Sequence, residues 1–175
     1  MRRKVTLAIL ILVCFLLQTT VFRSLEMGQV GPNLLITITI SFGFMQGKKE
    51  GLMVGFFSGL LIDIFYGDFL GFYAMLYMYL GYLSGFFCKI FFDEDIKVPI
   101  FMVAAGDFLL NMMIFILRFL FRGRVELFSY IKMIIFPEIV YTVLISVILY
   151  RIFYSINKKL VTVEKRGTSA LWLRN

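Results

Sequence analysis

The chain has 175 residues, of which 61% are hydrophobic and 18% aromatic, and its mean hydropathy is +0.90. Soluble domains use about 45–50% apolar residues, so a soluble fold is excluded because a domain of this length could not bury so much apolar surface. The net charge of +7 comes from Lys and Arg at the ends of apolar runs, and this distribution excludes nucleic-acid binding, which needs a basic patch or an amphipathic stripe.

Apolar runs of roughly 15–25 residues, separated by short charged patches, predict an all-α integral membrane protein. The basic start at Arg2 and Arg3 resembles a signal peptide, but no small-x-small cleavage site follows the first run, so we expect an uncleaved first helix. A basic cytoplasmic tail, residues 156–175, is expected to lie on the anionic inner leaflet. The preceding bundle, residues 1–155, is expected to hold six spans, at about 5–22, 33–47, 51–67, 71–91, 98–121 and 131–154.

The second run is the shortest of the six. Residues 33–47 make a helix of only about 22 Å at ~1.5 Å per residue, against a hydrocarbon core of ~30 Å. The run begins after Gly31-Pro32, which favours helix entry. It is either a thin span beside protein neighbours or a re-entrant segment, and re-entry leaves five crossings. With the N-terminus inside, 13 of the 18 Lys and Arg residues are cytoplasmic, which favours six spans with both termini cytoplasmic.

Small residues recur at every fourth position of the third run. In membrane helices such a stripe lets two backbones approach closely, which matters because lipid provides no hydrophobic drive for helix association. The fourth run carries small residues as well, so we expect the two runs to form a tight hairpin, and packing alone accounts for its glycines. The residues of this expected contact are Gly51, Gly55, Gly59, Asp63, Gly67, Gly71, Ala74, Gly81 and Gly85.

The fifth run holds the polar residues that are hardest to explain by packing. Asn111 and Arg118 follow Asp107 at offsets of 4 and 11, which places all three within about 40° on one helix face. Polar side chains at that depth face the bundle interior or a cavity. In the sixth run Glu138 follows a proline. By depth we expect a buried ion pair of Arg118 with either Asp63 or Glu138.

The same residues predict no enzyme. Paired carboxylates can perform acid–base chemistry, but the chain has no histidine, no partner nucleophile, no metal-ligand spacing and no nucleotide-binding loop. Cys14 and Cys88 both lie in apolar runs and form no C-x-x-C. We therefore expect no catalytic residue, no metal and no cofactor. Asp68, in the turn after the third run, is interpreted as a turn-former.

The run Gly55-x3-Gly59-x3-Asp63-x3-Gly67-x3-Gly71-x2-Ala74 resembles the best-defined motif of the rod shape-determining protein MreD family. Small size, a short basic N-terminus, Pro32-Asn33 at the start of the second run and a proline in the last run resemble that family too. The resemblance covers essentially the whole chain.

This resemblance implies a non-enzymatic scaffold or regulator of the bacterial cell-elongation machinery, the elongasome, which makes peptidoglycan during rod growth. It implies a multi-pass protein of the bacterial cytoplasmic membrane that partners the membrane helix of MreC and its adjacent periplasmic segment. Through MreC it influences MreB, RodA and the transpeptidase partner of RodA. The fold is expected to resemble the substrate-binding subunits of energy-coupling-factor transporters. We expect the glycine faces and the outer loops to hold MreC.

A second hypothesis is a small-molecule-binding membrane subunit, like those transporter components, or a handler of lipid intermediates. In that case the face of Asp107, Asn111 and Arg118 lines a cavity, because costly polarity in mid-membrane points to a functional site by default. An ion channel is disfavoured because no acidic ring or filter sequence is present.

Overall fold

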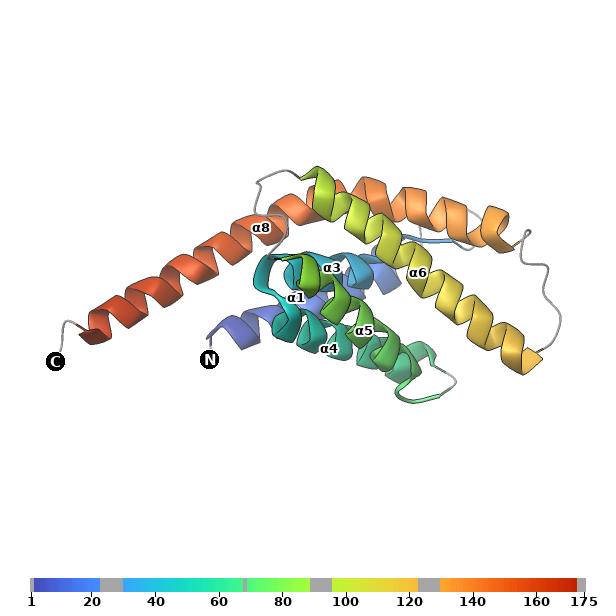
Figure 1. The fold of residues 1–175 in the computed structure, drawn as a ribbon, viewed down its shortest axis with the longest axis horizontal. Coiled ribbons are helices and arrows are strands. Elements are labelled where there is room, and N and C mark those ends of the chain that lie inside the picture. The colour runs from blue at the N-terminus through green and yellow to red at the C-terminus, as the bar shows by residue number, and fades with distance from the viewer. Residues whose placement is uncertain (1, 23–29, 68, 89–95, 123–129, 173–175) are drawn as a thin grey trace.

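The computed structural model describes residues 2–22, 30–67, 69–88, 96–122 and 130–172, although the side chains of 2, 118–122 and 163–172 lie outside that description. The described chain is helical, and each of the six expected runs contains one helical segment (Figure 1). The elements are α1 (Arg2–Leu16) with the π-helical turn η1 (Leu17–Val21), α3 (Leu34–Gln46), α4 (Lys48–Tyr66), α5 (Phe72–Phe87), α6 (Lys97–Arg122), and the π-helical turn η2 (Ile131–Ile135) with α8 (Phe136–Trp172).

Three of these segments are long and apolar enough to cross a membrane by themselves. They are Arg3–Val21, Lys97–Leu117 and Ile131–Thr162. The other three are shorter: α3 has 13 residues, α4 has 19 and α5 has 16. The helix ends differ from the expected ones mainly in α5, which stops at Phe87, and in α8, which continues through the expected tail to Trp172.

The continuation of α8 has a simple local cause. No proline and only one glycine, Gly167, occur between the end of the sixth expected run and Trp172, so little in the local sequence opposes helix propagation. At ~1.5 Å per residue the 37 residues of α8 reach about 56 Å. Figure 1 shows its C-terminal part extending well past the other helices.

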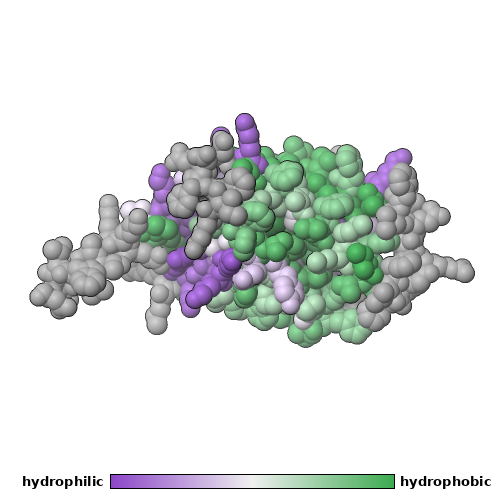
Figure 2. All heavy atoms as spheres, in the orientation of Figure 1, coloured by the Kyte–Doolittle hydropathy of each residue, from purple (hydrophilic) through white to green (hydrophobic). Residues whose placement is uncertain are grey.

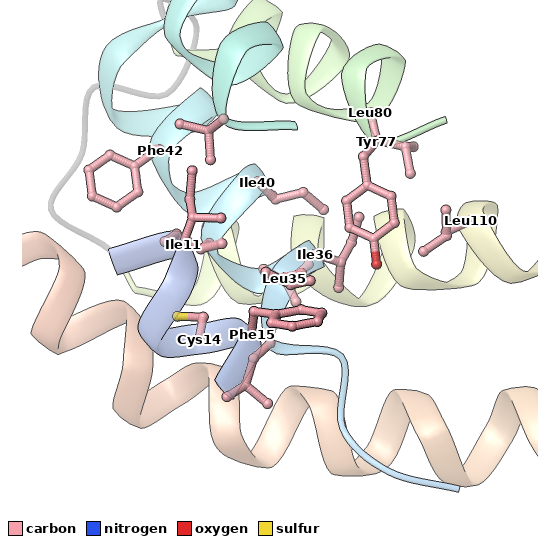
Figure 3. Packing of buried hydrophobic residues seen from close by; sticks show 14 of the residues in the cluster. Ile11, Cys14, Phe15, Leu35, Ile36, Ile40, Phe42, Tyr77, Leu80 and Leu110 are labelled. Carbon is pink, nitrogen blue, oxygen red and sulfur yellow. The ribbon is translucent and has the colours of Figure 1, made fainter. Parts of the chain in front are cut away.

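The short helix α3 forms the centre of the bundle. Every residue from Leu34 to Phe44 is buried, because apolar and β-branched side chains surround the helix on all sides and all of them need cover. Helices α1, α4, α5, α6 and α8 all contact it. Figure 3 shows Leu35 and Ile36 of α3 among side chains from the neighbouring helices, including Phe15, Tyr77 and Leu110.

The closest helix pair is α4 against α5. A Cβ atom built on Gly51 would overlap the carbonyl oxygen of Gly81, and one built on Gly55 would overlap that of Tyr77. One built on Gly59 would overlap the backbone of Tyr73. Each step of four residues forward along α4 thus matches a step of four residues back along α5. The two helices are antiparallel and their backbones touch along the glycine stripe.

One end of the bundle brings together segments that are far apart in the sequence. Arg3 hydrogen-bonds Gln46, and Gln46 hydrogen-bonds Asn157. Arg3 also lies 3.7 Å from the carboxylate of Glu50. The Nζ of Lys48 lies 4.0 Å from the ring centroid of Phe86. The start of α1, the α3–α4 turn, the end of α5 and the second half of α8 therefore share this end.

The glycine contact predicts a strong size limit on α4. Gly55→Leu should lower the thermal unfolding temperature of the purified protein in detergent. It should also lower the free energy of unfolding by at least the ~1–3 kcal/mol typical of overpacking. The reason is that the obstructing atoms belong to the backbone of Tyr77 and cannot rotate away.

Met75→Leu is the matched control, because Met75 is 46% exposed on α5 and the change conserves volume. Equal melting temperatures for Gly55→Leu and Met75→Leu would show that the two helices do not need close approach.

Candidate functional site

Asp63 links the two helices of the α4–α5 hairpin through a buried side chain. The side chain is 3% exposed, and its carboxylate accepts three backbone hydrogen bonds, from the N–H groups of Gly71 at 3.0 Å, Tyr73 at 2.8 Å and Ala74 at 2.8 Å. The first amides of a helix have no partner within the helix, and a negative charge beside them is favourable. Asp63, one turn before the end of α4, therefore caps the N-terminus of α5.

This arrangement gives Asp63 partners that the expected ion pair did not include. The side chain of Arg118 lies outside the described residues, so its pairing with Asp63 or with Glu138 stays a prediction. Asp68 also lies outside the described residues. Glycine is needed at the start of α5, because Gly71 has φ +101°, a backbone conformation that residues with a Cβ atom rarely adopt.

Asn33 is the centre of a second buried polar group. Its Oδ1 accepts from the backbone N–H of Ile36 at 3.1 Å, which caps α3, and from the hydroxyl of Tyr77 at 2.9 Å. Its Nδ2 donates to Oδ1 of Asp107 at 3.5 Å, and its backbone N–H donates to Oγ1 of Thr142 at 3.0 Å. One side chain thus connects α3 with α5 and α6, and its backbone adds α8.

Gln18 completes the cap on α3. Its Oε1 accepts from the backbone N–H groups of Leu34 at 3.0 Å and Leu35 at 3.2 Å. Without water, each of these amides must find a partner within the protein. Gln18, Tyr77 and Thr142 were not predicted as site residues, although a lone glutamine in the first apolar run and an asparagine directly before a helix were the visible signals.

Asp107 and Asn111 both point inward, on the side of α6 that faces the bundle. Asp107 is fully buried and Asn111 is 5% exposed. The Nδ2 of Asn111 donates to the backbone carbonyl of Asp107 at 3.1 Å, and Glu138 of α8 is half-buried and close enough to Asp107 for the two carboxyl groups to interact. Oδ2 of Asp107 has no hydrogen-bond partner within the part of the chain that the structure describes. The polar groups of α6 and α8 are therefore brought together, close beside the Asn33 group.

The chemistry that this site can perform is chiefly structural. No group of three or more His, Cys, Asp or Glu side chains converges to hold a metal ion among the residues described. The carboxylate of Asp63 is saturated by backbone amides, and Asn33 uses both ends of its amide group within the bundle. The bonds of Asn33 fix α5, α6 and α8 relative to α3, and the bonds of Asp63 fix α5 relative to α4.

The outer surface is apolar over its middle part. Figure 2 shows hydrophobic residues across the centre of the visible face, with hydrophilic residues nearer the two ends. Large exposed side chains occur on every outer helix, such as Ile9, Tyr79, Phe101 and Leu144. The glycines of α4, in contrast, are covered by α5. The expectation that these glycines hold a partner chain is therefore wrong, since their backbone contact is already used within the hairpin.

Comparison with known proteins gives one match. The family model described as "rod shape-determining protein MreD" matches residues 1–160. No curated protein and no solved structure matches the chain. The matched range takes in α1 to α6 and α8 up to residue 160, and so contains the Asp63 cap and the whole Asn33 group.

The Asp63 cap predicts a graded loss of stability. Asp63→Asn keeps one acceptor oxygen and should lower the stability less than Asp63→Ala, which leaves one buried and two partly buried amides without an acceptor. We expect a loss of about 1–3 kcal/mol for the alanine variant, measured by thermal unfolding in detergent.

Arg118→Leu in the wild-type and Asp63→Asn backgrounds separates capping from ion pairing. Capping predicts additive losses, whereas a direct pair between Arg118 and Asp63 makes the losses non-additive. Equal stability of Asp63→Ala and the wild type would contradict the cap.

The Asn33 group predicts energetic coupling between α3 and α5. Asn33→Ala should destabilise the protein more than Tyr77→Phe, because it leaves a helix amide, a tyrosine hydroxyl and a carboxylate without their partner. In the double variant the loss should be smaller than the two single losses together, since both remove the same 2.9 Å hydrogen bond.

Tyr82→Phe is the control, because Tyr82 is 43% exposed and its hydroxyl is not part of this group. Strict additivity of Asn33→Ala and Tyr77→Phe would show that their bond contributes nothing.

Proposed function

Because the chain belongs to the MreD family of rod shape-determining proteins, we propose that it is a non-enzymatic membrane scaffold of the bacterial cell-elongation machinery. It acts through a complex with MreC and through it on MreB, RodA and the transpeptidase partner of RodA. The observation that carries the proposal is the family match, which extends over residues 1–160 and includes parts of all six helical segments.

The geometry agrees with a scaffold rather than a catalyst. The buried polar side chains bond to helix ends and to one another, as Asp63 and Asn33 do. Such bonds stabilise one arrangement of helices. The outward-facing surface then consists largely of apolar side chains at the level of the membrane, which is the surface that another membrane helix can contact.

We propose that all six helical segments cross the cytoplasmic membrane, with both termini inside. The contacts of Arg3 with Gln46 and of Gln46 with Asn157 place α1, the α3–α4 turn and α8 at one end. Arg3 and the first residues of α4, Lys48 and Lys49, lie at that end as well, as positive-inside topology requires. The short α3 can cross the membrane although it is shorter than the hydrocarbon core, because other helices, not lipid, surround it.

The docking surface for MreC is then made of large apolar side chains and not of the glycine stripe. Single cysteines at Ile9, Tyr79, Phe101 and Leu144 sample the outward faces of α1, α5, α6 and α8. In cells, a crosslinker attached at these positions should capture MreC from one face of the bundle. A cysteine at position 58 should not, because Ser58 is fully buried in α4.

Cys88 is replaced in all of these variants so that the added cysteine is the one that reacts, and Cys14 is retained because it is only 2% exposed.

Gly59→Leu and Gly81→Leu should in addition abolish rod shape, because the α4–α5 hairpin cannot close around the added side chains. Normal rod shape without any MreC crosslink from the outward faces would overturn the scaffold proposal.

A small-molecule carrier is the second candidate, and one observation favours it. Oδ2 of Asp107 is buried without a hydrogen-bond partner within the described part of the chain, which is uncommon unless a ligand or water meets the group. Native mass spectrometry after mild purification separates the two functions. A bound small molecule that Asp107→Asn removes would favour the carrier.

A further inference from the structure

A groove runs between α1 and α4 on the outside of the bundle. It has a volume of about 360 Å³, and its lining residues are apolar except for Lys4 and Glu50 at one end. Its walls include Leu12 and Phe57, which are 49% and 48% exposed. The groove therefore opens toward the membrane rather than toward the buried polar group around Asn33.

The two ends of the groove differ in chemistry. At the charged end Arg3 lies 3.7 Å from Glu50, so this acid already has a cationic partner. Lys4 faces the groove with no acidic partner within the described residues. At the other end the ring of Phe15 packs against Phe65, with centroids 5.1 Å apart. The groove thus has a cationic mouth and an aromatic end.

Its dimensions suit a single hydrocarbon chain. Glu50 and Ile64, both in the wall, are fourteen residues apart on α4, which corresponds to about 21 Å at ~1.5 Å per residue. The lining residues of α1, from Lys4 to Leu12, cover about 12 Å in the same direction. The groove is therefore elongated along the helices, which is also the direction of a lipid acyl chain in a membrane.

We propose that the α1–α4 groove binds one acyl chain of an anionic phospholipid, with its phosphate beside Lys4. Apolar walls match the acyl chain, and the ammonium group of Lys4 matches the phosphate of the headgroup. Anionic lipids attract basic residues at the cytoplasmic surface of the membrane, and Arg2, Arg3, Lys4, Lys48 and Lys49 all belong to this end of α1 and α4. The inference does not depend on the proposed complex with MreC.

The experiment uses the full chain reconstituted with phosphatidylglycerol that carries a photoreactive diazirine in its acyl chain. Crosslinked peptides should map to α1 and α4, on the residues that line the groove. Ala8→Phe places a ring in the groove and should lower this labelling several-fold. Val5→Phe is the matched control, because Val5 is 57% exposed on α1 but does not line the groove.

A second variant tests the headgroup without changing the groove. Lys4→Gln should lower labelling by phosphatidylglycerol about fivefold, the effect of ~1 kcal/mol for one basic residue at a membrane surface. It should leave labelling by a phosphatidylcholine probe unchanged. Lys159→Gln, on α8, is the control and should change neither.

Two outcomes would overturn the proposal. Labelling spread evenly over the outward faces of α1, α6 and α8, and unaffected by Ala8→Phe, would mean ordinary boundary lipid. Crosslinking of Ala8→Cys to the membrane helix of another protein, without lipid labelling in the groove, would mean a protein occupant. Unchanged melting temperatures for Ala8→Phe and Lys4→Gln ensure that lost labelling is not lost folding.

Discussion

The arrangement of this protein depends on satisfying helix ends where no water is present. A short helix in the centre of a membrane bundle exposes its first amides to the protein interior, and each unpaired amide is costly in that surrounding. Asn33 and Gln18 provide the acceptors for α3, and Asp63 provides them for α5. Because these acceptors belong to other segments, capping a helix also fixes its neighbours.

Close backbone contact and polar capping act on the same hairpin. The glycines of α4 bring α5 near enough for the carboxylate of Asp63 to reach amides eight to eleven residues further along the chain. The cap in turn holds the end of α5 in the register that the glycines need. The motif that identifies the family is therefore one structural unit, and its side chains are directed inward. The described outer surface is largely apolar, and among the described residues Lys4 has no acidic partner.

Several features of the site were predictable because they depend on local spacing. Asp107 and Asn111 were expected on one inward face of a helix, since an offset of four residues places two side chains together, and both are buried. The partners of Asp63 were not predictable in this way. A depth argument paired it with Arg118, whereas its described partners are the amides that the next helix presents after the turn. Similarly, Asn33 could be recognised as a helix cap, but its bonds to Tyr77, Asp107 and Thr142 join positions 44 to 109 residues apart.

The sequence by itself determined the helical membrane class, the order of six apolar segments, the close hairpin of the third and fourth, and the family. These properties follow from composition, periodicity and motif spacing, which are local. Only the tertiary structure decided that α3 lies at the centre, that its cap joins it to η1, α5, α6 and α8, and that a groove lies between α1 and α4. Those features depend on which distant segments meet, and hydropathy carries no information about that because every segment is apolar.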